Sequence, residues 1–96
     1  QPGIILTSPN QNAAYRLVPN LPATNQRIEV RALPLGIPNL SEVSFYVDDD
    51  LFATLEQPPY VVLWQLLPGQ HTFRAVGIDS AGQTWHSPPV QITVVQ

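Results

Sequence analysis

The chain has 96 residues, of which 44% are hydrophobic and 11% are charged, and its formal net charge is −3. Its four arginines and its lack of lysine exclude the cation clusters that bind nucleic acid or anionic membrane surfaces. The lack of cysteine excludes disulfides and thiol chemistry.

The first half of the chain contains three short segments with strand character. Residues 3–7 are apolar and β-branched and end before Pro9, and residues 14–18 suit a short edge strand. Residues 26–33 alternate between apolar and charged side chains, which predicts a half-buried strand. Residues 34–39 contain two prolines and predict a loop.

The next two strands are predicted to form a hairpin. Residues 42–48 alternate with period two, and residues 51–55 return after the acidic turn at residues 48–50. A further strand is expected at residues 60–67, with Trp64 on its apolar face. Pro68 and Gly69 then predict a turn.

The last part of the chain continues the same pattern. In residues 70–78 we expect His71, Phe73, Ala75 and Gly77 to face inward. The turn at residues 79–82 combines a capping Asp with a glycine that is free to take a positive φ. The last strand is expected to start at residues 83–86, to be interrupted by two prolines and to resume at residues 90–94.

No segment has a helical apolar period, so we expect no helix longer than a single turn. Seven or eight short antiparallel strands predict an all-β sandwich of two sheets that share one core. We expect residues 1–96 to form a single domain of a longer protein. Prolines next to several predicted edges favour a monomeric domain.

Several motifs resemble those of bacterial immunoglobulin-like domains. They read V-S-F-Y-V-D-D-D-L-F-A-T-L, P-P-Y-x-x-x-W-x-L-x-P-G-x-H-T-F-x-A-x-G-x-D-x-x-G and V-x-I-T-V. Together with I-x-L-T-S-P, A-Y-R-L and Q-R-I-E-V-R-A, they look most like the C-terminal domain of bifunctional penicillin-binding proteins, the peptidoglycan glycosyltransferase-transpeptidases. One departure is Asp49, where the hairpin usually carries glycine. The resemblance implies an immunoglobulin-like fold and a non-catalytic accessory domain.

We expect no catalytic residue in this domain. Without lysine, the Ser-x-x-Lys and Lys-Thr-Gly motifs of penicillin-reactive sites cannot be present. A Ser-His-Asp set is possible by inventory, but no Gly-x-Ser-x-Gly motif marks a nucleophile. The candidates for that set are Ser80 or Ser87, His71 or His86, and Asp79. Residues 79–82 are more simply interpreted as a turn.

No metal or cofactor is expected either. Asp48, Asp49 and Asp50 could suggest calcium, but adjacent carboxylates in a tight hairpin cannot all face one ion, so we interpret them as a solvated acidic turn. His71 has no ligand partner in the sequence pattern, and we predict that its ring nitrogens bond loop backbone near one end of the sandwich. His86 is predicted to be exposed.

Trp85 leaves one binding hypothesis open. It lies between a glycine turn and two prolines, where it could pack over the sandwich edge. Alternatively, it could stand exposed with Tyr46 or Tyr60 as a sugar-stacking platform. These three aromatic residues are the possible ligand surface.

Two functions follow from these observations. The first is a spacer or docking domain of an extracytoplasmic, membrane-anchored cell-wall synthase, with other domains of the parent protein, peptidoglycan or a cell-wall protein as partners. The alternative is a carbohydrate-binding or adhesion module of a secreted glycoside hydrolase. Neither nucleic acid nor direct membrane insertion is expected, since the longest apolar run is far too short to span a bilayer.

Overall fold

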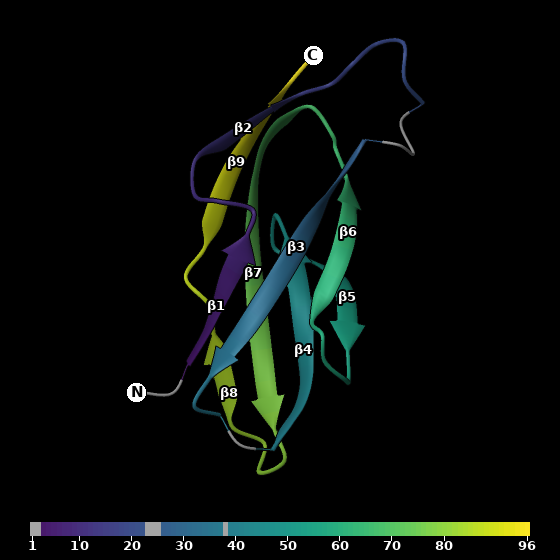
Figure 1. Ribbon diagram of the computed structural model, residues 1–96. Coiled ribbons are helices and arrows are strands. Elements are labelled where there is room, and N and C mark those ends of the chain that lie inside the picture. The colour runs from purple at the N-terminus through teal and green to yellow at the C-terminus, as the bar shows by residue number, and fades with distance from the viewer. Residues whose placement is uncertain (1–2, 23–25, 38) are drawn as a thin grey trace.

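The computed structural model describes residues 3–22, 26–37 and 39–96, which form nine β-strands and no helix (Figure 1). The strands are β1 (Gly3–Ser8), β2 (Ala13–Arg16), β3 (Arg27–Leu35), β4 (Leu40–Val47), β5 (Asp50–Leu55), β6 (Val61–Gln65), β7 (Gly69–Asp79), β8 (Thr84–His86) and β9 (Val90–Val95). Over the described ranges, therefore, no helix is long and apolar enough to cross a membrane.

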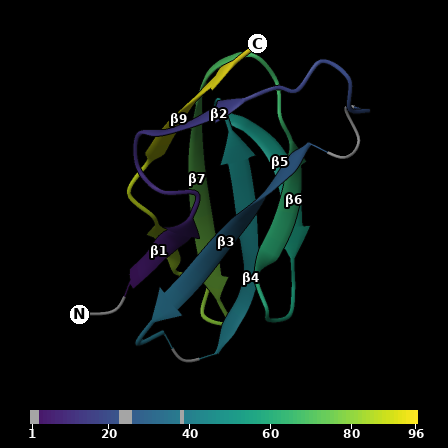
Figure 2. The same ribbon diagram turned by 45° about the horizontal axis from the view of Figure 1, so that its top comes forward.

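The strands form two sheets that pack face to face, which confirms the predicted all-β sandwich. One sheet has the order β1-β3-β6, and the other has the order β2-β9-β7-β4-β5 with β8 paired to β7. Figures 1 and 2 show β3 crossing in front of β7 and β4. The described residues thus contain nine strands, more than the seven or eight expected, because the last predicted strand is divided into β8 and β9, which pair with different parts of β7.

The strand β3 is longer than predicted. It continues through Pro34 to Leu35, where a loop was expected. The amide of Ala32 donates to the carbonyl of Tyr60 at 2.9 Å, so the backbone nitrogen of Ala32 faces the β6 side of the strand. The backbone nitrogen of Pro34, two residues later, faces the same side. Because β6 pairs only as far as Arg31, the missing N–H of Pro34 costs no ladder bond. Of the predicted loop, Pro38 lies outside the described residues.

One strand pair is parallel, whereas all pairs were expected to be antiparallel. After β1 the chain turns near Asn12 and joins the other sheet, where β2 runs alongside β9. Backbone bonds of 2.8 Å from Asn12 to Gln91 and from Leu17 to Val95 hold the two ends of this pair. The prediction that this segment is an edge strand is confirmed.

The hairpin between β4 and β5 turns at Asp48 and Asp49, whose φ angles are 52° and 69°. Two positive φ angles at the central positions are what a type I′ hairpin turn requires. Aspartate tolerates this region better than most residues, so the sequence achieves the turn without the glycine usual at position 49.

Alternation of side chains along each strand builds the core between the sheets. Phe45, Phe73, Ile4, Ile92, Val30 and Val43 are the largest fully buried side chains. The predictions that Trp64 is a core residue and that Phe73, Ala75 and Gly77 face inward are confirmed.

The molecule is elongated, with extents of 47 × 22 × 19 Å. The first strand starts at one end, where Gly3 pairs with Leu35 beside the connection from β3 to β4. The last strand finishes at the other end, where Val94 pairs with Gly69 (Figure 1).

Candidate functional site

The structure does not bring Trp85, Tyr46 and Tyr60 together on one surface. Tyr60 is only 7% exposed and belongs to the core. Trp85 lies opposite Gly77, whose inner face is buried, and its half-buried ring packs against the core from the edge of the sandwich. Tyr46 points to the outer face of β4, since its neighbours Phe45 and Val47 pack on the core side. A platform of all three rings is therefore not formed.

Tyr46 nevertheless takes part in a polar cluster on the outer face of the six-stranded sheet. The guanidinium carbon of Arg74 lies 5.4 Å from the centre of its ring. Arg74 also donates to the carboxylate of Asp49 at 3.0 Å. The guanidinium covers one face of this ring, so a ligand that stacks on that face would have to displace it.

The structure separates His71 from Asp79, and Asp79 and Ser87 of the hypothetical Ser-His-Asp set bond backbone amides. Asp79 accepts bonds from the amides of Ala81 at 3.0 Å and Gln83 at 2.8 Å, as a turn-capping residue does. His71 lies eight residues away on the same strand, roughly 26 Å at strand rise. Ser87 is buried and its hydroxyl accepts the amide of Ala75. The turn interpretation of residues 79–82 is confirmed, and Gly82 has a φ of 85°.

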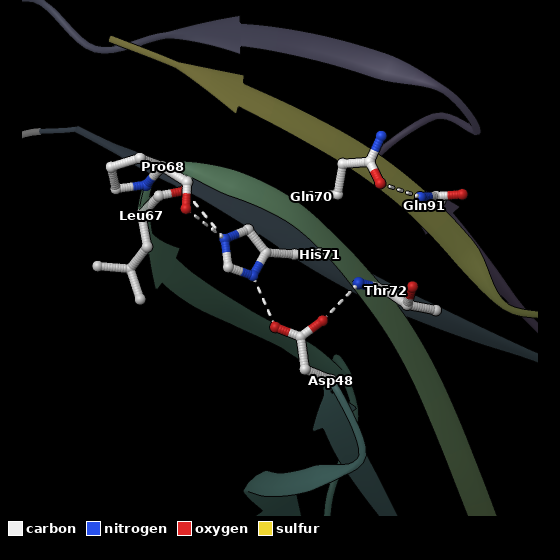
Figure 3. A network of polar contacts seen from close by, with 7 residues as sticks. All are labelled: Asp48, Leu67, Pro68, Gln70, His71, Thr72 and Gln91. Carbon is white, nitrogen blue, oxygen red and sulfur yellow. Dashed lines mark hydrogen bonds and ion pairs between the residues drawn. The ribbon is translucent and has the colours of Figure 1, made fainter.

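The polar network that the structure does build is centred on His71 (Figure 3). Its Nδ1 lies 2.6 Å from a carboxylate oxygen of Asp48, at the tip of the β4–β5 hairpin. Its Nε2 lies 3.0 Å from the carbonyl oxygen of Leu67 and 3.3 Å from that of Pro68, in the turn between β6 and β7. The second oxygen of Asp48 accepts the amide of Thr72 at 3.0 Å. The prediction that the His71 ring bonds loop backbone is confirmed for Nε2, whereas Nδ1 bonds the side chain of Asp48 instead.

Aromatic packing fixes the imidazole ring from the core side. The ring of Trp64 meets that of His71 edge-on at a centroid distance of 4.8 Å, and it meets Phe73 in the same way at 5.1 Å. The His71 side chain is only 12% exposed. The network therefore closes one end of the hydrophobic core.

The charges of the pair stabilise each other. Burial alone would lower the pKa of His71, but the bonds to Asp48 and to the two turn carbonyls outweigh it and raise that pKa above its ordinary value. Burial alone would raise the pKa of Asp48, but the bonds from His71 and the Thr72 amide, with the nearby positive charge, leave it lowered. Both shifts favour an imidazolium beside a carboxylate.

This arrangement holds strand ends together and leaves no open ligand position. Both ring nitrogens of His71 already face acceptors, so neither is free to bind a metal ion or to move a substrate proton. Across residues 3–22, 26–37 and 39–96, no three His, Cys, Asp or Glu side chains gather as a metal site. His86 is exposed, as predicted.

Sequence reasoning missed the pairing of Asp48 with His71. The two residues are 23 positions apart, and nothing in the alternation of either strand links them. The available signal was the positive-φ turn itself, because a carboxylate at a hairpin tip beside the sandwich end can reach a neighbouring strand.

Comparisons with known proteins show the fold. No protein-family model matches the sequence, and no curated protein matches it either. Fibronectin(III)-like modules of Clostridium thermocellum CbhA are similar, with a TM-score of 0.82 and 22% identity, over 96% of this chain and 94% of that chain. A Jonesia denitrificans lytic polysaccharide monooxygenase is also similar, with a TM-score of 0.55 and 20% identity, over 90% of this chain and 58% of that chain. The domain therefore has a fibronectin(III)-like β-sandwich fold.

Proposed function

We propose that this chain is a non-catalytic accessory module that spaces the domains of an extracytoplasmic carbohydrate-active protein. The observation that carries the proposal is the likeness to fibronectin(III)-like modules over nearly the whole length of both chains. The name of the second similar protein, a polysaccharide monooxygenase, supports the carbohydrate context. This context favours the alternative function drawn from the sequence over the peptidoglycan synthase, which stays a prediction based on motifs alone.

The shape of the module supports a spacing role. Its first and last strands end at opposite poles of a body 47 Å long. A domain with this arrangement separates whatever is attached to its two ends. The polar side chains that could have served chemistry instead bond backbone groups at strand ends, as His71 and Asp79 do.

Binding and activity assays separate this proposal from its rivals. The chain would be incubated with insoluble cellulose, chitin and peptidoglycan, and both retained protein and released soluble sugar would be measured. A spacer should show no saturable retention and no sugar release. Released sugar would overturn the non-catalytic assignment.

Retention on one polysaccharide would instead replace spacing by glycan docking. Tyr46→Ala would then test the outer face of β4, since loss of retention in that variant would assign the ligand to the cluster of Tyr46 and Arg74.

Small-angle scattering of the chain provides an independent check of the spacer proposal. The spacer proposal needs a rigid particle with a longest dimension near 47 Å, and a compact sphere or a flexible coil would contradict it.

A further inference from the structure

The bonds of His71 connect the two sheets of the sandwich. Asp48 follows β4 of the six-stranded sheet, whereas Leu67 and Pro68 follow β6 of the three-stranded sheet. The imidazole lies between them on β7 and bonds both, at 2.6 Å and 3.0 Å. Figure 3 shows the ring bridging the carboxylate and the turn carbonyls.

We propose that His71 is a pH-sensitive latch, which ties the β6–β7 turn to the β4–β5 hairpin while it is protonated and releases that turn when it loses its proton. The two protonation states of the ring differ in hydrogen-bond capacity. An imidazolium has two N–H donors, and a neutral imidazole has one N–H and one lone pair. His71 faces acceptors at both nitrogens, so the neutral ring must give up one of its two connections.

The connection most easily lost is the one to the turn. The carboxylate of Asp48 is held in place by the Thr72 amide as well, and it forms the shorter contact. A neutral ring that keeps its proton on Nδ1 for Asp48 would point a lone pair at the carbonyls of Leu67 and Pro68. Two lone pairs facing each other at 3.0 Å repel, and a side chain only 12% exposed gives little room for water between them.

The other groups around the ring are apolar or engaged elsewhere. From β6 the neighbour is the Trp64 ring, and from β9 the register partner is Ile92. From the hairpin, Asp49 is engaged by Arg74 on the outer face. Among the described residues, Asp48 is the titratable group that contacts His71. The proton on His71 therefore controls the latch.

The raised pKa of His71 sets the direction of the response. A group with a raised folded-state pKa stabilises the fold fully below its unfolded value, about 6.5 for histidine, and that contribution is lost as pH rises through the folded value. The lowered pKa of Asp48 sets the acid limit, because its contribution is present above about pH 4 and is lost as pH falls through the folded value. The latch is closed between these limits and opens as the pH rises through the folded-state pKa of His71.

The experiment follows His71 of the full chain by NMR. Imidazole nitrogen shifts should show that His71 is protonated on both nitrogens below its transition, and that this transition lies above the ordinary histidine value of about 6.5. Amide exchange at Gly69 and Gln70 should then accelerate beyond the intrinsic rise with pH, by up to tenfold for each pH unit above the transition. Thr72, on the Asp48 side, should remain protected longer.

Two variants keep the test decisive. His71→Gln should remove the additional acceleration, with exchange at the turn already fast at neutral pH, whereas His86→Gln should leave the wild-type profile unchanged. Titration of His71 at or below the ordinary histidine value of about 6.5 would overturn the proposal. The proposal would also be overturned if amide exchange at the β6–β7 turn followed only the intrinsic rate through the His71 transition. This measurement uses the wild-type chain, so it remains valid even if His71→Gln fails to fold.

Discussion

Ser87 occupies the point where β7 changes partners, and its substitution gives the sharpest test of how this fold is held together. Along one side, β7 pairs with β9 from Gly69 to Phe73 and with β8 from Val76 to Ile78. Between these ladders lies Ala75, which is fully buried. Ser87 bonds both backbone groups of Ala75. The Ser87 hydroxyl accepts the Ala75 amide at 2.8 Å, and the Ser87 amide donates to the Ala75 carbonyl at 2.9 Å.

Ser87→Ala removes the acceptor and leaves the buried amide of Ala75 without a partner. An unsatisfied buried donor costs about 1–3 kcal/mol. For a domain of this size, each kcal/mol lowers the melting temperature by roughly 4–8 °C. With a urea m-value of about 1 kcal/mol/M, the midpoint should fall by roughly 1–3 M. Urea unfolding followed by Trp64 fluorescence measures this directly.

Ser80→Ala is the matched control. Ser80 is exposed and contributes only its backbone amide, which bonds the carbonyl of Asn39 at 2.9 Å and is unaffected by the substitution. The free energy of unfolding of Ser80→Ala should stay within about 0.5 kcal/mol of the wild-type value. If Ser87→Ala unfolds at the same urea concentration as Ser80→Ala, the Ser87 hydroxyl does not substitute for a strand partner and the reasoning is refuted.

Two further predictions concern residues with positive φ. Gly82→Ala should destabilise the domain by about 1 kcal/mol, because φ is 85° and no atom within 4 Å could contribute a compensating contact; an unchanged denaturation midpoint would contradict this. Asp49→Gly should raise the free energy of unfolding by up to about 1 kcal/mol, because glycine relieves the left-handed backbone at φ 69° and the exposed pair with Arg74 contributes little. A fall in the denaturation midpoint would show that this ion pair outweighs the backbone strain.

The strands and the core were predictable because their signals are local. Period-two alternation puts successive side chains on opposite faces, so the buried sets containing Val30 and Ala32 on β3 and Phe73 and Ala75 on β7 follow from the sequence alone. Turns at Pro68-Gly69 and Asp79–Gly82 were predictable for the same reason, since their φ requirements select particular residues.

The features that were missed all depend on a partner distant in sequence. Pro34 remains within a strand because β6 begins opposite Arg31 and does not extend alongside Pro34, which cannot be known before the sheet order is known. The parallel pairing of β2 with β9 joins segments nearly eighty residues apart. The exposure of Tyr60 and Trp85 depends likewise on what covers them, and neither ring lies on an open surface shared with Tyr46.

The longest strand explains why so few side chains are left to serve chemistry. β7 has eleven residues and contacts both the β4 ladder and, in turn, β9 and β8. Each place where its pairing begins, changes or ends requires a polar group: His71 near its start, Ser87 at the change of partner and Asp79 at its end. These residues include the serine, histidine and aspartate that the sequence offered as a catalytic inventory. Buried backbone N–H and C=O groups of a β-sandwich need hydrogen-bond partners. Because these polar side chains provide such partners, they support a module whose polar residues maintain its shape.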